Sequence, residues 1–192
     1  MTEKYILVIN SELTLELPIV KTKHFSYYSF NMMGMAKWNR VIGDEMYQLV
    51  QKHPNGKKID SIITVESKAI GLTQVLAERF NVDKYIILRK SKKSYMANPI
   101  EFKSQTIISG ECSYWIDSAD LDYLKDKNIL VVDDVISTGG TIKAILNALN
   151  HHHLVPNLIA CALTENTPWT TFDGIDVISC GHIPLLPGEQ ND

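Results

Sequence analysis

The 192-residue sequence is poor in cysteine and contains no long hydrophobic run. Its three cysteines, Cys112, Cys161 and Cys180, are odd in number and widely spaced, which argues against a disulfide framework or a zinc site. The longest apolar stretch, residues 158–163, is far too short to cross a bilayer. The N-terminal residues also lack the layout of a signal peptide. We therefore expect a cytoplasmic protein with reduced thiols and no membrane partner.

The sequence also lacks an excess of basic charge. It has 19 Lys and Arg residues against 22 Asp and Glu residues, which gives a formal net charge of −3. A nucleic-acid-binding surface needs a basic footprint, so we expect no nucleic-acid partner. The Walker, dinucleotide-binding and nucleophile-elbow patterns are absent as well. The length and a hydrophobic content of 45% fit one globular domain spanning residues 1–192.

Short apolar runs alternate with helical stripes along the chain. This alternation predicts an α/β fold with a central parallel sheet flanked by helices on both faces. Ligands of such sheets bind at the carboxyl ends of the strands. Residues 91–104 are polar and contain no clear element, whereas residues 106–116 could form one or two strands of a hairpin. We expect strands at residues 5–9, 59–65, 85–88, 129–132, 158–163 and 175–179, and helices within residues 36–53, 72–80 and 142–149.

The most informative segment covers residues 129–141. Its first four residues are apolar and indicate a strand buried on both faces, and Asp133 and Asp134 follow directly. A turn of serine, threonine and glycine then leads into a helix with one apolar face. Such a turn directs backbone N–H groups to the positive end of the helix, where a phosphate monoester would bind. Because the two carboxylates can accept hydrogen bonds from hydroxyls, the segment predicts a ribose 5-phosphate site.

This order of residue types resembles the phosphoribosyl pyrophosphate signature of the type I phosphoribosyltransferases, and most of all that of purine members close to adenine phosphoribosyltransferase. The resemblance implies an enzyme of purine salvage that transfers ribosyl 5-phosphate from phosphoribosyl pyrophosphate to a purine base and releases pyrophosphate. Adenine is the favoured base, with hypoxanthine, guanine or xanthine as alternatives. The resemblance also implies Mg²⁺ carried by the substrate near Asp133 and Asp134, and a homodimer.

A second polar segment, Glu66-Ser67-Lys68, follows the strand at residues 59–65 and precedes a helix, which suits another anion site. In the resembled family this is the pyrophosphate loop, and Lys68 stands where those members carry arginine, so it offers charge without a bidentate fork. The resemblance assigns catalytic roles to Asp133, Asp134 and Lys90. It assigns substrate binding to Ser137, Thr138, Gly139, Gly140, Thr141, Glu66, Ser67, Lys68, Arg89, Lys93 and Val135.

The resemblance further implies a small hood and a flexible active-site loop. We expect the hood to come from residues 11–35 and 180–192, and the mobile loop from residues 91–110, which would close over the substrates and exclude water. The methionines between residues 32 and 35 are expected to fill gaps in a small core. Two alternatives stay open: a regulator that senses phosphoribosyl pyrophosphate without catalysis, and an orotate or uracil transferase of the same fold.

Overall fold

The computed structural model describes residues 4–22, 26–106 and 110–186. Its centre is a six-stranded sheet in the order β10-β11-β9-β8-β4-β5. Neighbouring strands from β11 to β5 are parallel, and only the pair β10–β11 is antiparallel. This confirms the predicted parallel sheet. The strands are β4 (Ser61–Val65), β5 (Ile86–Leu88), β8 (Ile129–Ile136), β9 (Leu158–Glu165), β10 (Thr171–Phe172) and β11 (Ile175–Ile183).

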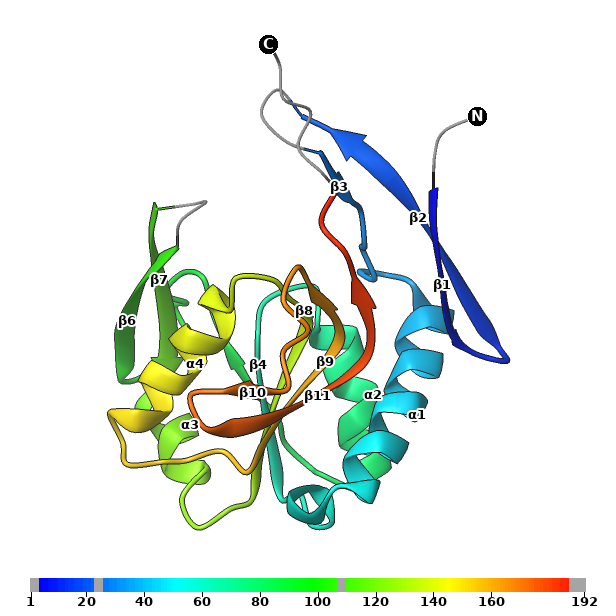
Figure 1. Cartoon of the computed structure of the whole chain (residues 1–192). Helices are drawn as coiled ribbons and strands as arrows, with labels where there is room; N and C mark the ends of the chain where they lie inside the picture. Colours follow the sequence, from blue (N-terminus) through cyan, green and yellow to red (C-terminus); the bar gives the residue numbers. More distant parts are fainter. Residues whose placement is uncertain (1–3, 23–25, 107–109, 187–192) are drawn as a thin grey trace.

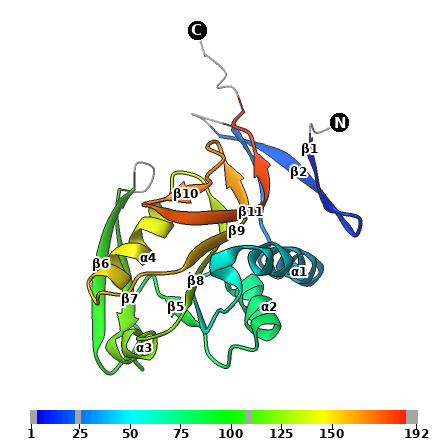
Figure 2. The same cartoon turned by 60° about the horizontal axis from the view of Figure 1, so that its bottom comes forward.

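Helices cover both faces of this sheet (Figures 1 and 2). On one face α1 (Ala36–Lys52) packs against α2 (Ile70–Phe80), and a single 3₁₀ turn, η1 (Pro54–Gly56), follows α1. On the other face α4 (Gly140–Asn150) packs against β8, near the short helix α3 (Ser118–Tyr123). Among the described residues, no helix is both long and apolar enough to span a membrane.

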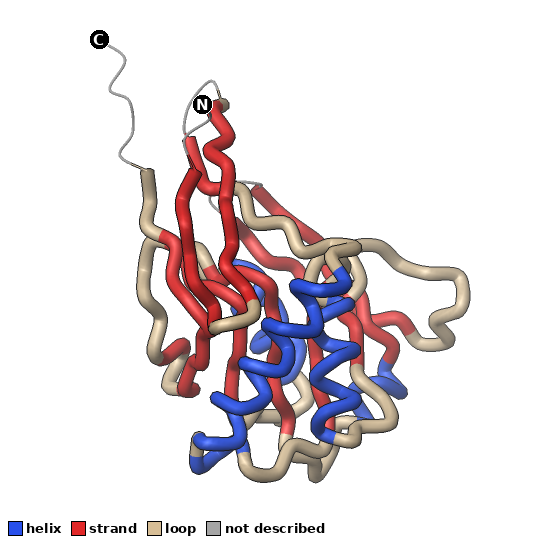
Figure 3. Tube along the Cα trace, turned by 90° about the vertical axis from the view of Figure 1, so that its right-hand side faces the viewer, coloured by secondary structure: helices blue, strands red, loops and turns tan. Residues whose placement is uncertain are grey.

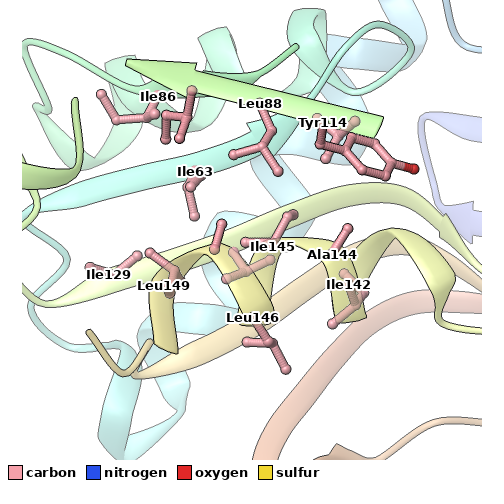
Figure 4. Packing of buried hydrophobic residues seen from close by; sticks show 14 of the residues in the cluster. Ile63, Ile86, Leu88, Tyr114, Ile129, Ile142, Ala144, Ile145, Leu146 and Leu149 are labelled. Atoms are coloured by element: carbon pink, nitrogen blue, oxygen red, sulfur yellow. The ribbon is translucent and has the colours of Figure 1, made fainter. Parts of the chain in front are cut away.

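Strand β8 separates two hydrophobic cores. Its alternate side chains, Ile129 and Val131, face the core beneath α4, whereas Leu130 and Val132 face the core beneath α1 and α2. The predicted strand is therefore buried on both faces. The apolar stripe of α4 is also buried as predicted, and Figure 4 shows it packed against the sheet. Burial of each large apolar side chain stabilises the folded state by about 1.5–3 kcal/mol, and this packing holds α4 in place after β8.

The N-terminal residues form a small antiparallel sheet that stands beside the carboxyl end of the central sheet (Figure 1). Its strands are β1 (Lys4–Asn10), β2 (Leu13–Lys21) and β3 (Ser26–Tyr28). In β2 the buried residues alternate with exposed ones, because one face covers the core shared with α1. Figure 3 shows these strands rising above α1 and α2. We call this three-stranded sheet the hood sheet, because β2 and β3 fall within the residues 11–35 predicted for the hood, whereas β1 precedes that range. Residues 187–192 of the other predicted hood segment lie outside the described residues.

The segment predicted to lack structure at residues 91–104 is partly a strand. β6 (Pro99–Thr106) pairs with β7 (Gly110–Asp117) as an antiparallel hairpin. Phe102 and Tyr114 lie opposite each other in this hairpin, and both are buried in the core beneath α4. The expectation was wrong there because the pairing strand and the covering helix, rather than local hydrophobicity, stabilise β6. The lid role of residues 91–110 stays a prediction, and residues 107–109 lie outside the described residues.

Candidate active site

A cleft of about 390 Å³ lies at the carboxyl ends of β4, β8, β9 and β11, next to the hood sheet. This is the place that the parallel sheet predicts for a ligand. Nine of the residues proposed from the sequence line the cleft together: Glu66, Ser67, Lys68, Lys90, Asp133, Asp134, Val135, Ser137 and Thr141. Three more, Thr138, Gly139 and Gly140, belong to the same turn as Ser137 and Thr141 without lining the cleft.

The two aspartates lie in the carboxyl-terminal half of β8, which continues to Ile136 rather than ending before Asp133 as predicted. Asp133 is only 6% exposed, and its Oδ1 accepts a hydrogen bond from the backbone N–H of Asp134 at 2.9 Å. Burial raises the pKa of the Asp133 carboxyl well above its usual value, and the neighbouring charge of Asp134 adds to the rise. Lys68 acts in the opposite direction and lowers the pKa of Asp133. A cationic or hydroxyl-bearing ligand would therefore stabilise the ionised form of Asp133.

The turn after β8 presents the amino end of α4 to the cleft. Gly139 occupies the position before the helix with φ of +78°, and without a side chain it leaves the first N–H groups of α4 free of a cap. These donors, together with Ser137 and Thr141 of the cleft, have the chemistry to bind an anion, and this role stays a prediction.

Two aromatic residues outside the motif hold this turn in place. The indole Nε1–H of Trp169 donates a hydrogen bond to the carbonyl oxygen of Ser137. The ring of Phe172 packs so closely on Gly139 that a Cβ there would lie 2.1 Å from Phe172 Cε2. The rings of Trp169 and Phe172 are themselves 5.1 Å apart. Gly139 is therefore required both by its backbone angle and by the space available.

On the β4 side of the cleft, the Glu66 carboxylate contacts three residues of the predicted basic cluster. Its carboxylate accepts the backbone N–H of Lys90 at 2.5 Å and lies 2.7 Å from Arg89 Nε, in an ion pair whose N–H is not aligned as a hydrogen bond. Lys93 Nζ lies 3.9 Å from the same carboxylate and donates to Ser91 Oγ. Arg89 and Lys93 thus lie beside the cleft and contact Glu66, while Lys68 and Lys90 line it.

Seven lining residues were not proposed from the sequence: Tyr27, Tyr28, Phe30, Met33, Val65, Glu165 and Ile183. The core role expected for the methionines is wrong for Met33 and Met35, which are 52% and 41% exposed, and Met33 lines the cleft. Met32 is fully buried in the core as expected. Glu165 carried a usable signal, since it is a charged residue at the end of an apolar strand, as Asp133 is. Tyr27, Tyr28 and Phe30 lie within the hood range 11–35 that the resemblance implied, but no local pattern distinguished these three residues from their neighbours.

Comparisons with known proteins agree with this geometry. A sequence profile of the phosphoribosyl transferase domain matches residues 37–168. A hypoxanthine/guanine phosphoribosyltransferase of Methanotorris igneus is 31% identical over 134 residues, which are 69% of each chain. A xanthine phosphoribosyltransferase of Clostridium tetani is 28% identical over 92 residues, which are 47% of this chain and 48% of the relative.

Solved structures agree on the fold. The crystal structure of adenine phosphoribosyltransferase from Thermoanaerobacter pseudethanolicus superposes with a TM-score of 0.67 at 20% identity, covering 87% of this chain and 95% of that one. The match confirms the predicted type I fold of a mostly parallel sheet with flanking helices. From the sequence profile and the archaeal relative, this chain belongs to the phosphoribosyl transferase family, which confirms the enzyme class predicted from its motif.

Proposed function

We propose that this chain transfers ribosyl 5-phosphate from phosphoribosyl pyrophosphate to a purine base and releases pyrophosphate. The observation that carries the proposal is that the amino end of α4 and the carboxylates of Asp133 and Asp134 line one cleft. A phosphate and a neighbouring pair of hydroxyls on one ligand would engage both features at once. The polar residues of the β4 loop lie in the same cleft and would receive the pyrophosphate.

The proposed roles follow from this placement. The turn from Ser137 to Thr141 holds the 5-phosphate, and Asp133 and Asp134 hold the ribose hydroxyls. Lys68 and Lys90 neutralise the departing pyrophosphate. Glu66, Arg89 and Lys93 form the ion-pair cluster beside them and keep the Lys90 backbone in position.

Little nucleophilic chemistry is required of the protein. Cleavage at the anomeric carbon ahead of bond formation leaves positive charge on the ribose, and catalysis then rests on positioning and on charge stabilisation. The ionised carboxylates of Asp133 and Asp134 supply negative charge close to the ribose. Closure of the predicted loop, residues 91–110, over the cleft would exclude water from this step.

The acidic residues fit a Mg²⁺ ion that arrives with the substrate. Among the described residues, no three His, Cys, Asp or Glu side chains gather into a metal site. Mg²⁺ commonly uses one or two carboxylates together with substrate phosphates and water, and Asp133 and Asp134 can provide that number. Bound there, the ion would offset the negative charge of the pyrophosphate.

The hood side of the cleft suits a planar base. Tyr27, Tyr28 and Phe30 supply aromatic surface there, and Val135 supplies an apolar one. We favour adenine, as the sequence resemblance implies, with hypoxanthine, guanine and xanthine as alternatives that the names of the relatives also support. A homodimer is proposed on the same resemblance.

A panel of bases tests the proposal. The protein is mixed with phosphoribosyl pyrophosphate and Mg²⁺, and pyrophosphate release is measured with each purine, orotate and uracil. We expect release with at least one purine and none with the pyrimidines. Turnover of a pyrimidine alone would contradict the purine assignment. Tight binding of phosphoribosyl pyrophosphate without turnover of any base would instead favour the sensing regulator.

A further inference from the structure

We propose that the carboxylate of Glu165 selects purines that carry an exocyclic amino group over their oxo counterparts. The proposal rests on the proposed transferase function and adds a specificity-determining residue to it. The amino purines are adenine and guanine, and the matched oxo purines are hypoxanthine and xanthine.

The strand order places Glu165 on the base side of the cleft. β8, which carries the two aspartates in its carboxyl-terminal half, lies between β4 and β9. The β4 loop with Glu66 and Lys68 is therefore on one side of the aspartates, and Glu165, the last residue of β9, is on the other. A ligand whose ribose lies over β8 and whose pyrophosphate lies over β4 directs its remaining substituent toward β9.

The surroundings of Glu165 also suit a base. Glu165 pairs with Ile183 at the end of β11, and both line the cleft together with the hood residues Tyr27, Phe30 and Met33. These neighbours are aromatic or apolar. Of the described residues that line this side, Glu165 alone carries a charge, so its carboxylate would dominate the polar recognition of a base there.

The backbone of Glu165 is fixed, but its carboxylate is unused. The Glu165 carbonyl oxygen accepts the N–H of Thr167 at 2.7 Å, and the N–H of Asn166 donates to Ile183 O at 3.1 Å. The side chain makes no hydrogen bond or ion pair with any described residue.

An ionised carboxylate can only accept hydrogen bonds. An amino group on the base donates to it, whereas a carbonyl oxygen at the same position is a second acceptor and is repelled by the carboxylate. A site built to hydrogen-bond one substituent rejects its replacement strongly, and for this half-exposed group we expect a preference of about tenfold or more in kcat/KM.

Matched base pairs test the assignment. We measure kcat/KM for adenine against hypoxanthine and for guanine against xanthine, with phosphoribosyl pyrophosphate and Mg²⁺ saturating. The wild-type chain should favour the amino purine in at least one pair. Glu165→Gln, whose amide both donates and accepts, should narrow that ratio by about tenfold. Glu165→Lys, which only donates, should invert it.

Two controls separate selection from general damage. Glu78→Gln, on the exposed face of α2, should leave the ratio unchanged. The KM for phosphoribosyl pyrophosphate should stay at the wild-type value in Glu165→Gln, because a merely structural role would change it. A wild-type preference for the oxo purine in both pairs, or a ratio that Glu165→Gln does not move, would overturn this inference alone. A failure to use any purine would overturn the proposed function as well.

Discussion

The indole Nε1–H of Trp169 donates a hydrogen bond to the carbonyl oxygen of Ser137 at 2.9 Å. The two residues are 32 positions apart and follow neighbouring strands, β9 and β8. The turn proposed to bind the phosphate is thus held by a residue outside its own motif. Together with the ring of Phe172 against Gly139, this contact fixes the turn before any ligand binds. Such preorganisation lowers the entropic cost of ordering the turn when a phosphate binds.

Removal of this hydrogen bond should weaken substrate binding without disturbing the fold. Trp169→Phe retains an aromatic ring beside Phe172 and leaves the Ser137 carbonyl without its donor. A neutral hydrogen bond contributes about 0.5–1.5 kcal/mol, so we expect the KM for phosphoribosyl pyrophosphate to rise about twofold to tenfold with little change in kcat. The affinity for free pyrophosphate, measured by calorimetry, serves as the internal control and should stay the same. An equal loss of both affinities would contradict the proposed role.

Gly139 should tolerate no side chain. Gly139→Ala places a Cβ 2.1 Å from Phe172 Cε2 at a φ of +78°. Overpacking costs about 1–3 kcal/mol and the left-handed backbone about 1–2 kcal/mol, so urea denaturation should show a loss of about 2–5 kcal/mol. The double variant Gly139→Ala/Phe172→Ala removes the clash and should recover part of what the two single variants lose separately. Strictly additive losses would show that the contact is unimportant.

The buried carboxyl of Asp133 should make stability depend on pH. Burial raises its pKa in the folded state above the unfolded value. Below the unfolded-state pKa the carboxyl is neutral in both states and its burial costs no stability. The free energy of unfolding then falls as the pH rises from that value through the folded-state pKa. Asparagine does not ionise, so Asp133→Asn avoids this fall. The difference in unfolding free energy between the variant and the wild type should therefore favour the variant more at pH 8 than at pH 4.

The same variant should be a poor enzyme, because the negative charge beside the ribose is gone. We expect kcat to fall about a hundredfold or more. Thermal denaturation at the two pH values, paired with a turnover assay at pH 8, checks both parts. A stability gain that is larger at pH 4 would contradict the stated environment of Asp133, and near-normal turnover would contradict its role.

Lys68 offers a test of the pyrophosphate side. Lys68→Ala removes a cation from the cleft, and the loss of a charged hydrogen bond of about 1.5–3 kcal/mol should weaken pyrophosphate binding at least tenfold. Lys68→Arg keeps the charge and adds a bidentate fork, so its affinity should equal or exceed that of the wild type. Calorimetric titration with pyrophosphate and Mg²⁺ measures both variants. Equal pyrophosphate affinities of Lys68→Ala and the wild type would contradict the proposed role of Lys68 in pyrophosphate binding.

The parts of the site that could be predicted are those that local sequence encodes. The apolar strand, Asp133, Asp134 and the glycine turn are contiguous, and the end of a parallel strand is where ligands bind. Trp169 and Tyr27 could not be assigned in this way. Their roles depend on which strand lies beside β8 and on how the hood sheet folds over the cleft, and no local pattern records either relationship.

The wrong expectation for β6 has the same cause, because contacts with distant segments stabilise this strand. Its sequence around Glu101 and Lys103 reads as polar, and its partner strand and α4 supply the stabilisation. Glu66 shows the intermediate case. Its place directly after β4 was predictable, but its ion pair with Arg89 joins residues that follow two neighbouring strands, β4 and β5, and forms only in the folded chain.

A crystal structure of the protein with phosphoribosyl pyrophosphate and Mg²⁺ tests the central claim most directly. We predict the 5-phosphate within the turn from Ser137 to Thr141, the ribose hydroxyls on Asp133 and Asp134, and the pyrophosphate beside Lys68. A complex in which the sugar phosphate binds elsewhere, or in which both aspartates face away from the ribose, would contradict the account.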